Sequence, residues 1–468
     1  MRQRKGVGHR LTLFLILSVF SSLTSCQAFL ANNSQATPTT IVQLTNTPAA
    51  PANILWVDTM RDLGPISKFT LGTNYGAFAG IGATNIDAVK NSGITLLRWP
   101  GGHWGDQNDV RPNLIDNYIL VARNIMNAEP SITVRLLGGT PGQAAQLVRY
   151  VNIDRKYGVK YWSIGNEPDL FIQEDQTWTP EYFAKRWREF ALAMKAIDPS
   201  IQLYGPDISD YVGDAQLDPR ELLYVKSVKQ DFTKRDYLTE FLKVNADLVN
   251  IVTIHRYPFP LKSTDGVASW DQLRDNTPQW DRILPNLHQL IKDTTGKDYP
   301  VGVMEFNSNS SDAAGTDTSP DSFYNALWLA DILGRMIRHQ PEMLAYWLLK
   351  NSLTGHGLMD SFDVRPTYYV YQIYKGFGNH LLDATSDTKY VSVFAAKQDD
   401  GSITVIVVNL NDNDIQKPLQ LNQGDALKMT ETYLFDKDHK AEPVSPSAFK
   451  NGDEVTLPAD SVTLYIFK

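Results

Sequence analysis

The 468-residue chain contains one cysteine, Cys26. A single thiol cannot form an intramolecular disulfide, and it excludes a metal site built from several cysteines. The 8 histidines are scattered, and none has the H-E-x-x-H spacing of a helical zinc site, so we expect no catalytic metal. The sequence also has no G-x-S-x-G elbow and no glycine-rich phosphate loop. We therefore expect no cofactor.

Positive charge is scarce as well. The formal net charge is −8, although residues 1–25 hold four cations, Arg2, Arg4, Lys5 and Arg10, and no acid. Without that segment the remaining chain carries a charge of about −12. An acidic chain with no basic block argues against nucleic acid as a partner.

The N-terminus holds the only long apolar run outside the body of the chain. Leu11–Phe20 follows a basic start and is too short to span a bilayer, which is typical of a secretory signal. Leu23-Thr24-Ser25-Cys26 resembles the bacterial lipobox. That resemblance implies that residues 1–26 are a lipoprotein signal, with cleavage before Cys26 and lipidation of its thiol. Several acyl chains would anchor the protein stably to a membrane. We expect an exported protein, in a bacterial cell envelope or extracellular. The alternative is an ordinary signal peptide or an uncleaved anchor, with an inert Cys26.

Charge is absent from the next segment, residues 27–53, which is rich in Asn, Thr, Ser, Pro and Ala. This composition predicts a flexible tether. Ile54–Met60 then has the pattern of a strand. We expect this strand, within residues 54–62, to pair with a sheet at the far end of the chain.

The body of the chain alternates short apolar segments with helical ones. Alternating strands and helices predict a parallel sheet, and eight such units over roughly 280 residues fit a (β/α)8 TIM barrel. We assign the barrel to residues 63–375. The expected strands are Phe69–Tyr75, Ile94–Trp99, Ile132–Leu137, Tyr161–Gly165, Gln202–Gly205, Leu248–His255, Val301–Glu305 and Leu344–Leu349. The expected helices include Pro141–Tyr157, Pro180–Ile197, Asp236–Asn245, Trp280–Thr294 and Ser322–Arg338.

The pattern changes after a last expected helix, Tyr368–Gly378. Short alternating segments follow, separated by turn sequences such as Asp399-Asp400-Gly401. Residues 376–468 therefore predict a small antiparallel β-sandwich domain. Its expected strands are Val391–Ala395, Ile403–Leu410, Met429–Leu434, Glu454–Leu457 and Val462–Phe467.

Two of the expected barrel strands end in a glutamate. Val159–Leu170 is an apolar run that leads into Asn166-Glu167-Pro168, and Pro300–Asn307 leads into Glu305. Asn-Glu-Pro alone is also compatible with a plain turn. In a (β/α)8 barrel, however, the chemistry lies at the carboxyl ends of the strands. Two carboxylic acids at such positions are the minimal set for glycoside hydrolysis.

Four motifs carry a family resemblance. Ile164–Pro168 (IGNEP) and Met304–Phe306 (MEF) resemble the clan A glycoside hydrolases. Leu97–Gly102 (LRWPGG) and Arg365–Gln372 (RPTYYVYQ) are similar to the α-L-arabinofuranosidase, β-xylosidase and heparanase-like families. The resemblance covers about residues 54–468 as motifs in the same order. It implies a retaining enzyme in which Glu305 is the nucleophile and Glu167 the general acid and then the base. It also implies that Asn166 holds the sugar 2-hydroxyl.

Other polar and aromatic strand ends supply candidates for the same site. Arg98 and Tyr257 are the candidate donors to Glu305, although Arg98 fits a structural ion pair and Tyr257 a core aromatic. Burial and the charge of Glu305 are expected to raise the pKa of Glu167. The remaining candidates for substrate contact are Trp99, Trp104 and Trp347 as stacking platforms, with His103, His255 and Asp207 as subsite groups.

The substrate class stays open at this point. A retaining glycoside hydrolase acting on hemicellulose-type arabinofuranosyl or xylosyl substrates is the first hypothesis. A glucanase or glucuronidase on the same fold is an alternative, and so is a surface carbohydrate-binding lipoprotein without activity. A uronic acid substrate would need cations in the cleft, for which Arg98, Arg256 and Lys350 are candidates.

Overall fold

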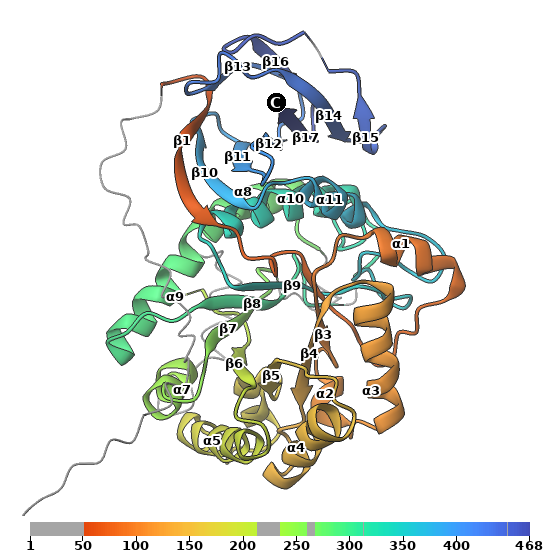
Figure 1. Ribbon diagram of the computed structural model, residues 1–468, viewed down its shortest axis with the longest axis vertical. Coiled ribbons are helices and arrows are strands. Elements are labelled where there is room, and N and C mark those ends of the chain that lie inside the picture. Colours follow the sequence, from red (N-terminus) through yellow and green to blue (C-terminus); the bar gives the residue numbers. More distant parts are fainter. Residues whose placement is uncertain (1–50, 213–234, 260–266, 312, 447) are drawn as a thin grey trace, which may run out of the picture. The chain divides into compact units, whose positions relative to one another are not determined.

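The computed structural model describes residues 51–212, 235–259, 267–311, 313–446 and 448–468 (Figure 1). The expected signal with Cys26, and most of the expected tether, lie outside the described residues. Within these ranges, none of the helices has the length and apolar character needed to cross a membrane.

Eight parallel strands form a closed barrel, which confirms the predicted fold. They follow one another in chain order, and the last strand pairs with the first through Ala345 and Gly72. The strands are β2 Gly72–Asn74, β3 Leu96–Trp99, β4 Glu129–Val134, β5 Tyr161–Ile164, β6 Gln202–Ile208, β7 Ile251–Arg256, β8 Val301–Phe306 and β9 Met343–Tyr346.

Helices surround the barrel (Figure 1). Several begin where the sequence places a cap: Thr140 accepts a hydrogen bond from the Gln143 N–H, and Thr179 accepts one from the Tyr182 N–H. The predicted helix Pro141–Tyr157 is an α-helix followed by a π-helical segment, Arg149–Asp154. The helices are α1 Ile86–Asn91, α2 Trp104–Gln107, α3 Pro112–Ile119, α4 Pro141–Val148, α5 Pro180–Ile197, α7 Tyr237–Asn245, α8 Trp270–Asn276, α9 Trp280–Thr295, α10 Phe323–Arg338 and α11 Pro366–Lys375.

The inside of the barrel is filled by side chains. This inner cluster has large residues from several strands, and every member is buried. A packed interior gives the strand ends above it a rigid floor. The members are Phe69, Leu96, Tyr161, Tyr204, Ile251, Met304, Met343 and Ala345.

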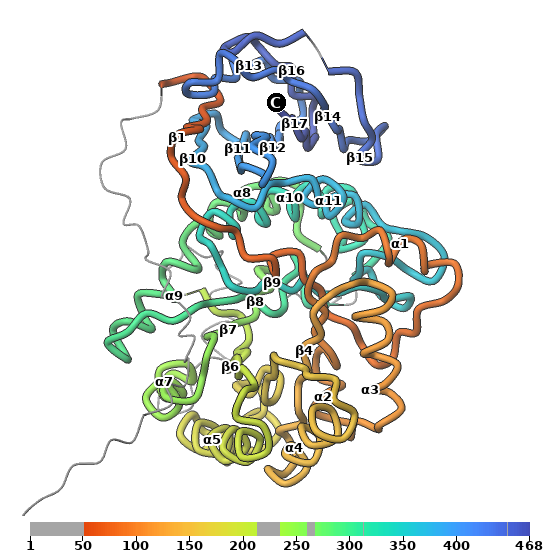
Figure 2. Tube along the Cα trace, in the orientation of Figure 1, coloured from red at the N-terminus to blue at the C-terminus, as the bar shows by residue number. Residues whose placement is uncertain are grey.

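Eight C-terminal strands and one N-terminal strand form a nine-stranded sheet, which curls around its own core (Figure 2). The order is β15-β14-β17-β12-β11-β10-β1-β13-β16, and every pair is antiparallel except β1 with β13. The N-terminal strand β1 therefore lies in this sheet, between β10 and β13. The strands are β1 Leu55–Pro65, β10 His380–Ser386, β11 Val391–Lys397, β12 Ile403–Asn409, β13 Ile415–Leu421, β14 Met429–Phe435, β15 Lys440–Val444, β16 Glu454–Leu457 and β17 Ser461–Phe467.

The sheet packs on the barrel through α10. In β12, Val405 and Val407 belong to the core inside the sheet, whereas Ile406 belongs to the core shared with the barrel. Gly334 of α10 lies against the Phe394 ring of β11, where an added Cβ would come 2.3 Å from that ring. The absence of a side chain at Gly334 thus lets the two surfaces meet closely.

Candidate active site

Glu305 lies near the carboxyl end of β8, buried among fixed donors. Its Oε1 accepts hydrogen bonds from Arg98 Nη1 at 2.7 Å and from the Gly102 N–H at 3.1 Å. Its Oε2 accepts one from the Tyr257 hydroxyl at 2.9 Å. The structure thus places Arg98 and Tyr257 where the sequence predicted donors to Glu305. Three donors favour the ionised carboxylate.

Arg98 ties together the ends of several strands. Its side chain is fully buried, and Nη1 also donates to Asn74 Oδ1 at 2.8 Å. Nη2 donates to Asn166 Oδ1 at 3.0 Å and to Asp207 Oδ2 at 3.2 Å. Burial acts to lower the pKa of Arg98, but the charges of Asp207 and Glu305 raise it by more than burial lowers it. The guanidinium therefore stays charged.

Glu167 follows β5 in an uncommon backbone conformation. Its φ of 48° lies in the left-handed region, and its N–H donates to the Asp207 carbonyl at 3.0 Å. A non-glycine residue held there costs about 1–3 kcal/mol, and such strain is concentrated at functional sites. The side chain has an imidazole beside each oxygen. His255 Nδ1 is 3.1 Å from Oε1, and the half-exposed His103 has its Nε2 3.5 Å from Oε2.

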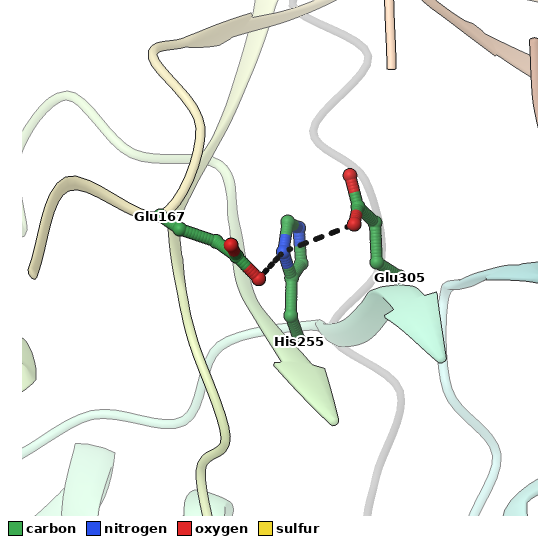
Figure 3. Close-up of side chains that lie close together, drawn as sticks. All are labelled: Glu167, His255 and Glu305. Carbon is green, nitrogen blue, oxygen red and sulfur yellow. Dashed lines mark hydrogen bonds and ion pairs between the residues drawn. The ribbon is translucent and has the colours of Figure 1, made fainter. Parts of the chain in front are cut away.

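His255 stands between the two glutamates (Figure 3). Its Nδ1 is 3.8 Å from Glu305 Oε2, and its Nε2 is 3.8 Å from Asp207 Oδ1. Burial alone would lower the pKa of His255, but the charges of Glu305, Asp207 and Glu167 outweigh burial and raise it. The imidazole is thus a favoured place for a proton between two carboxylates.

The pKa of Glu167 differs from the expectation. Burial acts to raise it, as predicted, but the hydrogen bond and positive charge of His255 have the larger combined effect, and the pKa is lowered. The expectation was wrong because it counted Glu305 and burial and left out the histidine. Both shifts therefore favour a proton on the imidazole of His255 over one on Glu167.

The same three side chains have a composition that could hold a metal. One ligand atom each from Glu167, His255 and Glu305 lies within 4.8 Å of the others. Two carboxylates and an imidazole can bind a divalent transition metal. Here, however, Arg98, Tyr257 and His255 already donate to the carboxylates. The two carboxylates of the cluster therefore already have hydrogen-bond partners within the site.

The tryptophans divide into two groups. Trp99 is 1% exposed and stacks on Tyr118 with ring centroids 5.0 Å apart, so the prediction of a sugar platform there is wrong. Trp347, after β9, is half-buried and lies against Gly101 and Gly102, where an added Cβ would come within 2.8 Å and 2.5 Å of its ring. Trp347 therefore remains the predicted platform. Trp104 is half-buried at the start of α2.

Three polar residues at the site were not predicted. Asn74 ends the first barrel strand and accepts from Arg98. Asp106 accepts from the Asn166 N–H at 2.8 Å, and Asp210 accepts from the Tyr257 N–H at 2.9 Å. A polar residue at a strand end is a signal that could have found Asn74. Asp106 lies in α2 and Asp210 lies beyond the end of β6, and no sequence pattern marks either position.

Comparison with known sequences gives partial matches. No family model matches the chain. The alpha-L-arabinofuranosidase C of Emericella nidulans is 29% identical over 168 residues, which are 27% of this chain and 33% of that protein. The chain thus matches about a third of the length of this relative. The intracellular exo-alpha-L-arabinofuranosidase of Bacteroides ovatus is 23% identical over 80% of this chain and 84% of that protein.

Solved structures match over most of the chain. The alpha-L-arabinofuranosidase of Thermotoga maritima has a TM-score of 0.67 at 17% identity, covering 88% of this chain and 99% of that one. CelM2, a bifunctional glucanase-xylanase from a metagenome library, has a TM-score of 0.67 at 18% identity, covering 89% and 99%. The chain therefore has the (β/α)8 barrel fold of the clan A glycoside hydrolases, joined to a curled, mostly antiparallel β-domain.

Proposed function

We propose that the chain is a retaining glycoside hydrolase in which Glu305 is the nucleophile and Glu167 the general acid and base. The observation that carries this proposal is the pair of buried glutamates at the ends of β8 and β5. Glu305 is surrounded by donors, and Glu167 is bonded to a histidine that can hold a proton.

The spacing of the two carboxylates supports retention. Oxygen atoms of Glu167 and Glu305 lie within 4.8 Å of each other. Retaining enzymes place the two carboxyl groups about 5–5.5 Å apart, while inverting enzymes leave about 6.5–9.5 Å for a water molecule. A direct attack by Glu305 on the sugar fits the shorter separation.

In the first step, a Glu305 oxygen bonds to the anomeric carbon as the bond from that carbon to the leaving oxygen breaks. His255 Nδ1 gives its proton to Glu167, whose Oε1 is 3.1 Å away, and Glu167 gives a proton to the leaving oxygen. Arg98 and the Gly102 N–H hold the attacking carboxylate in place. Burial and the charge of Glu305 raise the pKa of Tyr257 well above its usual range, so its hydroxyl remains a donor.

In the second step, water attacks the anomeric carbon and Glu305 leaves as a carboxylate. Glu167 takes the proton of that water, which requires Glu167 to be ionised. The lowered pKa of Glu167 suits this step directly. The pair Glu167–His255 thus ends the cycle with the one proton that it had at the start.

Three cations that could have recognised a uronic acid are engaged elsewhere. Arg98 is fully buried against its carboxylate and amide partners. Arg256 is also buried and donates to Gln279 at 3.2 Å, and Lys350 donates to the Gly80 carbonyl at 2.8 Å. These contacts support a neutral glycoside. Because both curated relatives are named arabinofuranosidases, we propose arabinofuranosyl or xylosyl groups of hemicellulose as the substrate.

The location of the enzyme is a separate proposal. The basic start, the apolar run and the lipobox-like Leu23–Cys26 support an exported protein that is anchored by lipid at Cys26. Labelling with a radioactive fatty acid would test this proposal. We expect label in the parent and none in Cys26→Ala.

Turnover of simple glycosides tests the enzyme proposal. The chain from Ala52 onward would be incubated with aryl α-L-arabinofuranoside, β-xyloside, β-glucoside and β-glucuronide, beside Glu305→Gln and Glu167→Ala. We expect hydrolysis of the arabinofuranoside or xyloside, and proton NMR should show a first product of unchanged anomeric configuration. No turnover of any glycoside by the parent would refute the proposal, and full activity in Glu305→Gln would refute the nucleophile.

A further inference from the structure

One short segment, Gly102–Asp106, follows β3 and runs into α2, and it contacts both glutamates. The Gly102 N–H donates to Glu305 at 3.1 Å, and His103 Nε2 lies 3.5 Å from Glu167. At the other end of the segment, Asp106 Oδ2 accepts a hydrogen bond from the N–H of Asn166, the residue before Glu167. The first two contacts are made to side chains, but the third is made to the backbone that carries the acid.

We propose that Asp106 is a positioning residue that holds the Asn166–Glu167 backbone in the geometry required for proton donation. This inference rests on the proposed function, since it concerns the same site. It assigns a role in catalysis to a carboxylate that touches no reacting atom.

The carboxylate of Asp106 links three strand ends. Its Oδ1 accepts from the N–H groups of Leu136 at 3.0 Å and Leu137 at 3.3 Å, just after β4. Its Oδ2 accepts from Asn166, just after β5. The bond to Asn166 fixes the Gly165–Asn166 peptide, and Asp207 fixes the N–H of the left-handed Glu167. The two consecutive peptides that lead into this strained residue are therefore both held by neighbouring segments.

Only an ionised carboxylate satisfies all of these donors. Asparagine offers one acceptor oxygen, so it can serve Leu136 and Leu137 or Asn166, but not both sides. The unserved N–H would be buried without a partner, which is unfavourable. In the described part of the chain, no lysine or arginine lies within ion-pair distance of Asp106, so backbone N–H groups supply its compensation.

The charges around Asp106 come from three elements. His103 belongs to its own segment, Glu167 follows β5, and Arg135 follows β4 and donates to the Asp106 carbonyl at 2.8 Å. Burial raises the pKa of Asp106 to about 6, against its three N–H bonds and the nearby His103. Protonation would turn one acceptor into a donor and release one of the linked strand ends. This titration agrees with a positioning role.

The test compares Asp106→Asn with a matched variant on the nucleophile side, Asp210→Asn. Asp210 accepts from the Tyr257 N–H, and Tyr257 donates to Glu305. kcat/KM would be measured for aryl glycosides of an arabinofuranose or xylose series, with leaving phenols from acidic dinitrophenol to phenol itself. Leaving groups of low pKa need no general acid, so they report on the nucleophile alone.

We expect Asp106→Asn to lose about 100-fold on the phenyl glycoside and less than about 5-fold on the dinitrophenyl glycoside. Asp210→Asn should lose a similar factor on both. Equal losses across the leaving groups in Asp106→Asn would overturn the proposal, since they would point to a general structural defect.

Asp106→Glu supplies a second variant that keeps the charge. It should show the same dependence on leaving group, with a smaller loss, while circular dichroism and melting temperature report its folding. If neither Asp106 variant folds, Asp106 serves stability and the proposal fails. A parent chain without activity on any glycoside would refute the proposed function itself, whereas an active parent with uniform losses refutes only the role of Asp106.

Discussion

The two glutamates are buried to a similar degree but have different neighbours. Glu305 accepts hydrogen bonds from a guanidinium, a phenol and a backbone N–H, none of which changes protonation near neutral pH. Glu167 faces two imidazoles, and imidazole does titrate in that range. Glu305 therefore has a fixed set of hydrogen-bond donors. The surroundings of Glu167 suit a carboxyl group that gains and loses a proton during the reaction.

Of the substitutions that test this comparison, Glu305→Gln should lower the activity most. The amide keeps the shape of the side chain but cannot form the covalent intermediate, so we expect kcat to fall about 10⁴-fold or more. The loss should be the same for activated and unactivated leaving groups. Steady-state kinetics on an aryl glycoside series measures both quantities. A loss that disappears with dinitrophenyl substrates would mean that Glu305 is the acid and that the two roles are reversed.

Glu167→Ala should have the next largest effect. We expect kcat/KM to fall about 10²–10⁴-fold on a phenyl glycoside and much less on a dinitrophenyl glycoside. Azide can enter the space left by the side chain and attack the glycosyl-enzyme. A glycosyl azide of retained configuration, identified by NMR, would sharpen the contrast with Glu305→Gln. No azide product from an enzyme that still hydrolyses the dinitrophenyl glycoside would contradict the assignment.

Asp106 accepts a hydrogen bond from the backbone next to Glu167, and its own titration affects the stability of the protein. Its folded-state pKa of about 6 lies above the ordinary value of 3.8, so the folded protein binds this proton more tightly than the unfolded chain. Binding of this proton stabilises the folded protein. The stabilisation is fully present below about pH 4 and is lost as pH rises through about 6. Its upper limit is about 3 kcal/mol.

Urea unfolding of the parent and Asp106→Asn between pH 4 and pH 7 measures this contribution. The difference between the two free energies of unfolding should change across that range, since the variant cannot bind the proton. A constant difference would show that Asp106 titrates as an ordinary surface carboxyl.

His255→Gln should have the smallest of these effects on rate, with a loss of about 10-fold, but it should move the pH profile. Glutamine can donate a hydrogen bond and carries no positive charge, so burial would raise the pKa of Glu167 with less opposition. The alkaline limb of kcat/KM, where the acid loses its proton, should therefore move to higher pH. An alkaline limb at the same pH in both proteins would show that His255 does not control the acid.

The chain order of the barrel was predictable because its strands are apolar and its helices are capped. Three strands of the C-terminal sheet were missed, β10, β13 and β15, and the last two contain a proline. Pro418 lies in β13, and Pro443 lies in the edge strand β15, where a missing N–H is tolerated. Sequence patterning treats proline as a strand breaker, so both strands were lost.

The errors at the site have different origins. Side chains alternate along a strand, so if Arg98 points into the barrel mouth, Trp99 must point outward to the helices. That inference was available from the sequence. The pKa of Glu167, in contrast, depends on His255, which is 88 positions away. Only the register of the barrel brings these two residues together.

The buried guanidinium of Arg98 has one more consequence. It is a rigid plane, and it binds Glu305 with one nitrogen and Asn166 with the other. The distance between the proposed nucleophile and the amide that precedes the acid is thus set by the width of a single side chain. The loops that shape the rest of the cleft can change in length without altering this distance. A protein built in this way can acquire new substrates while its reaction stays the same.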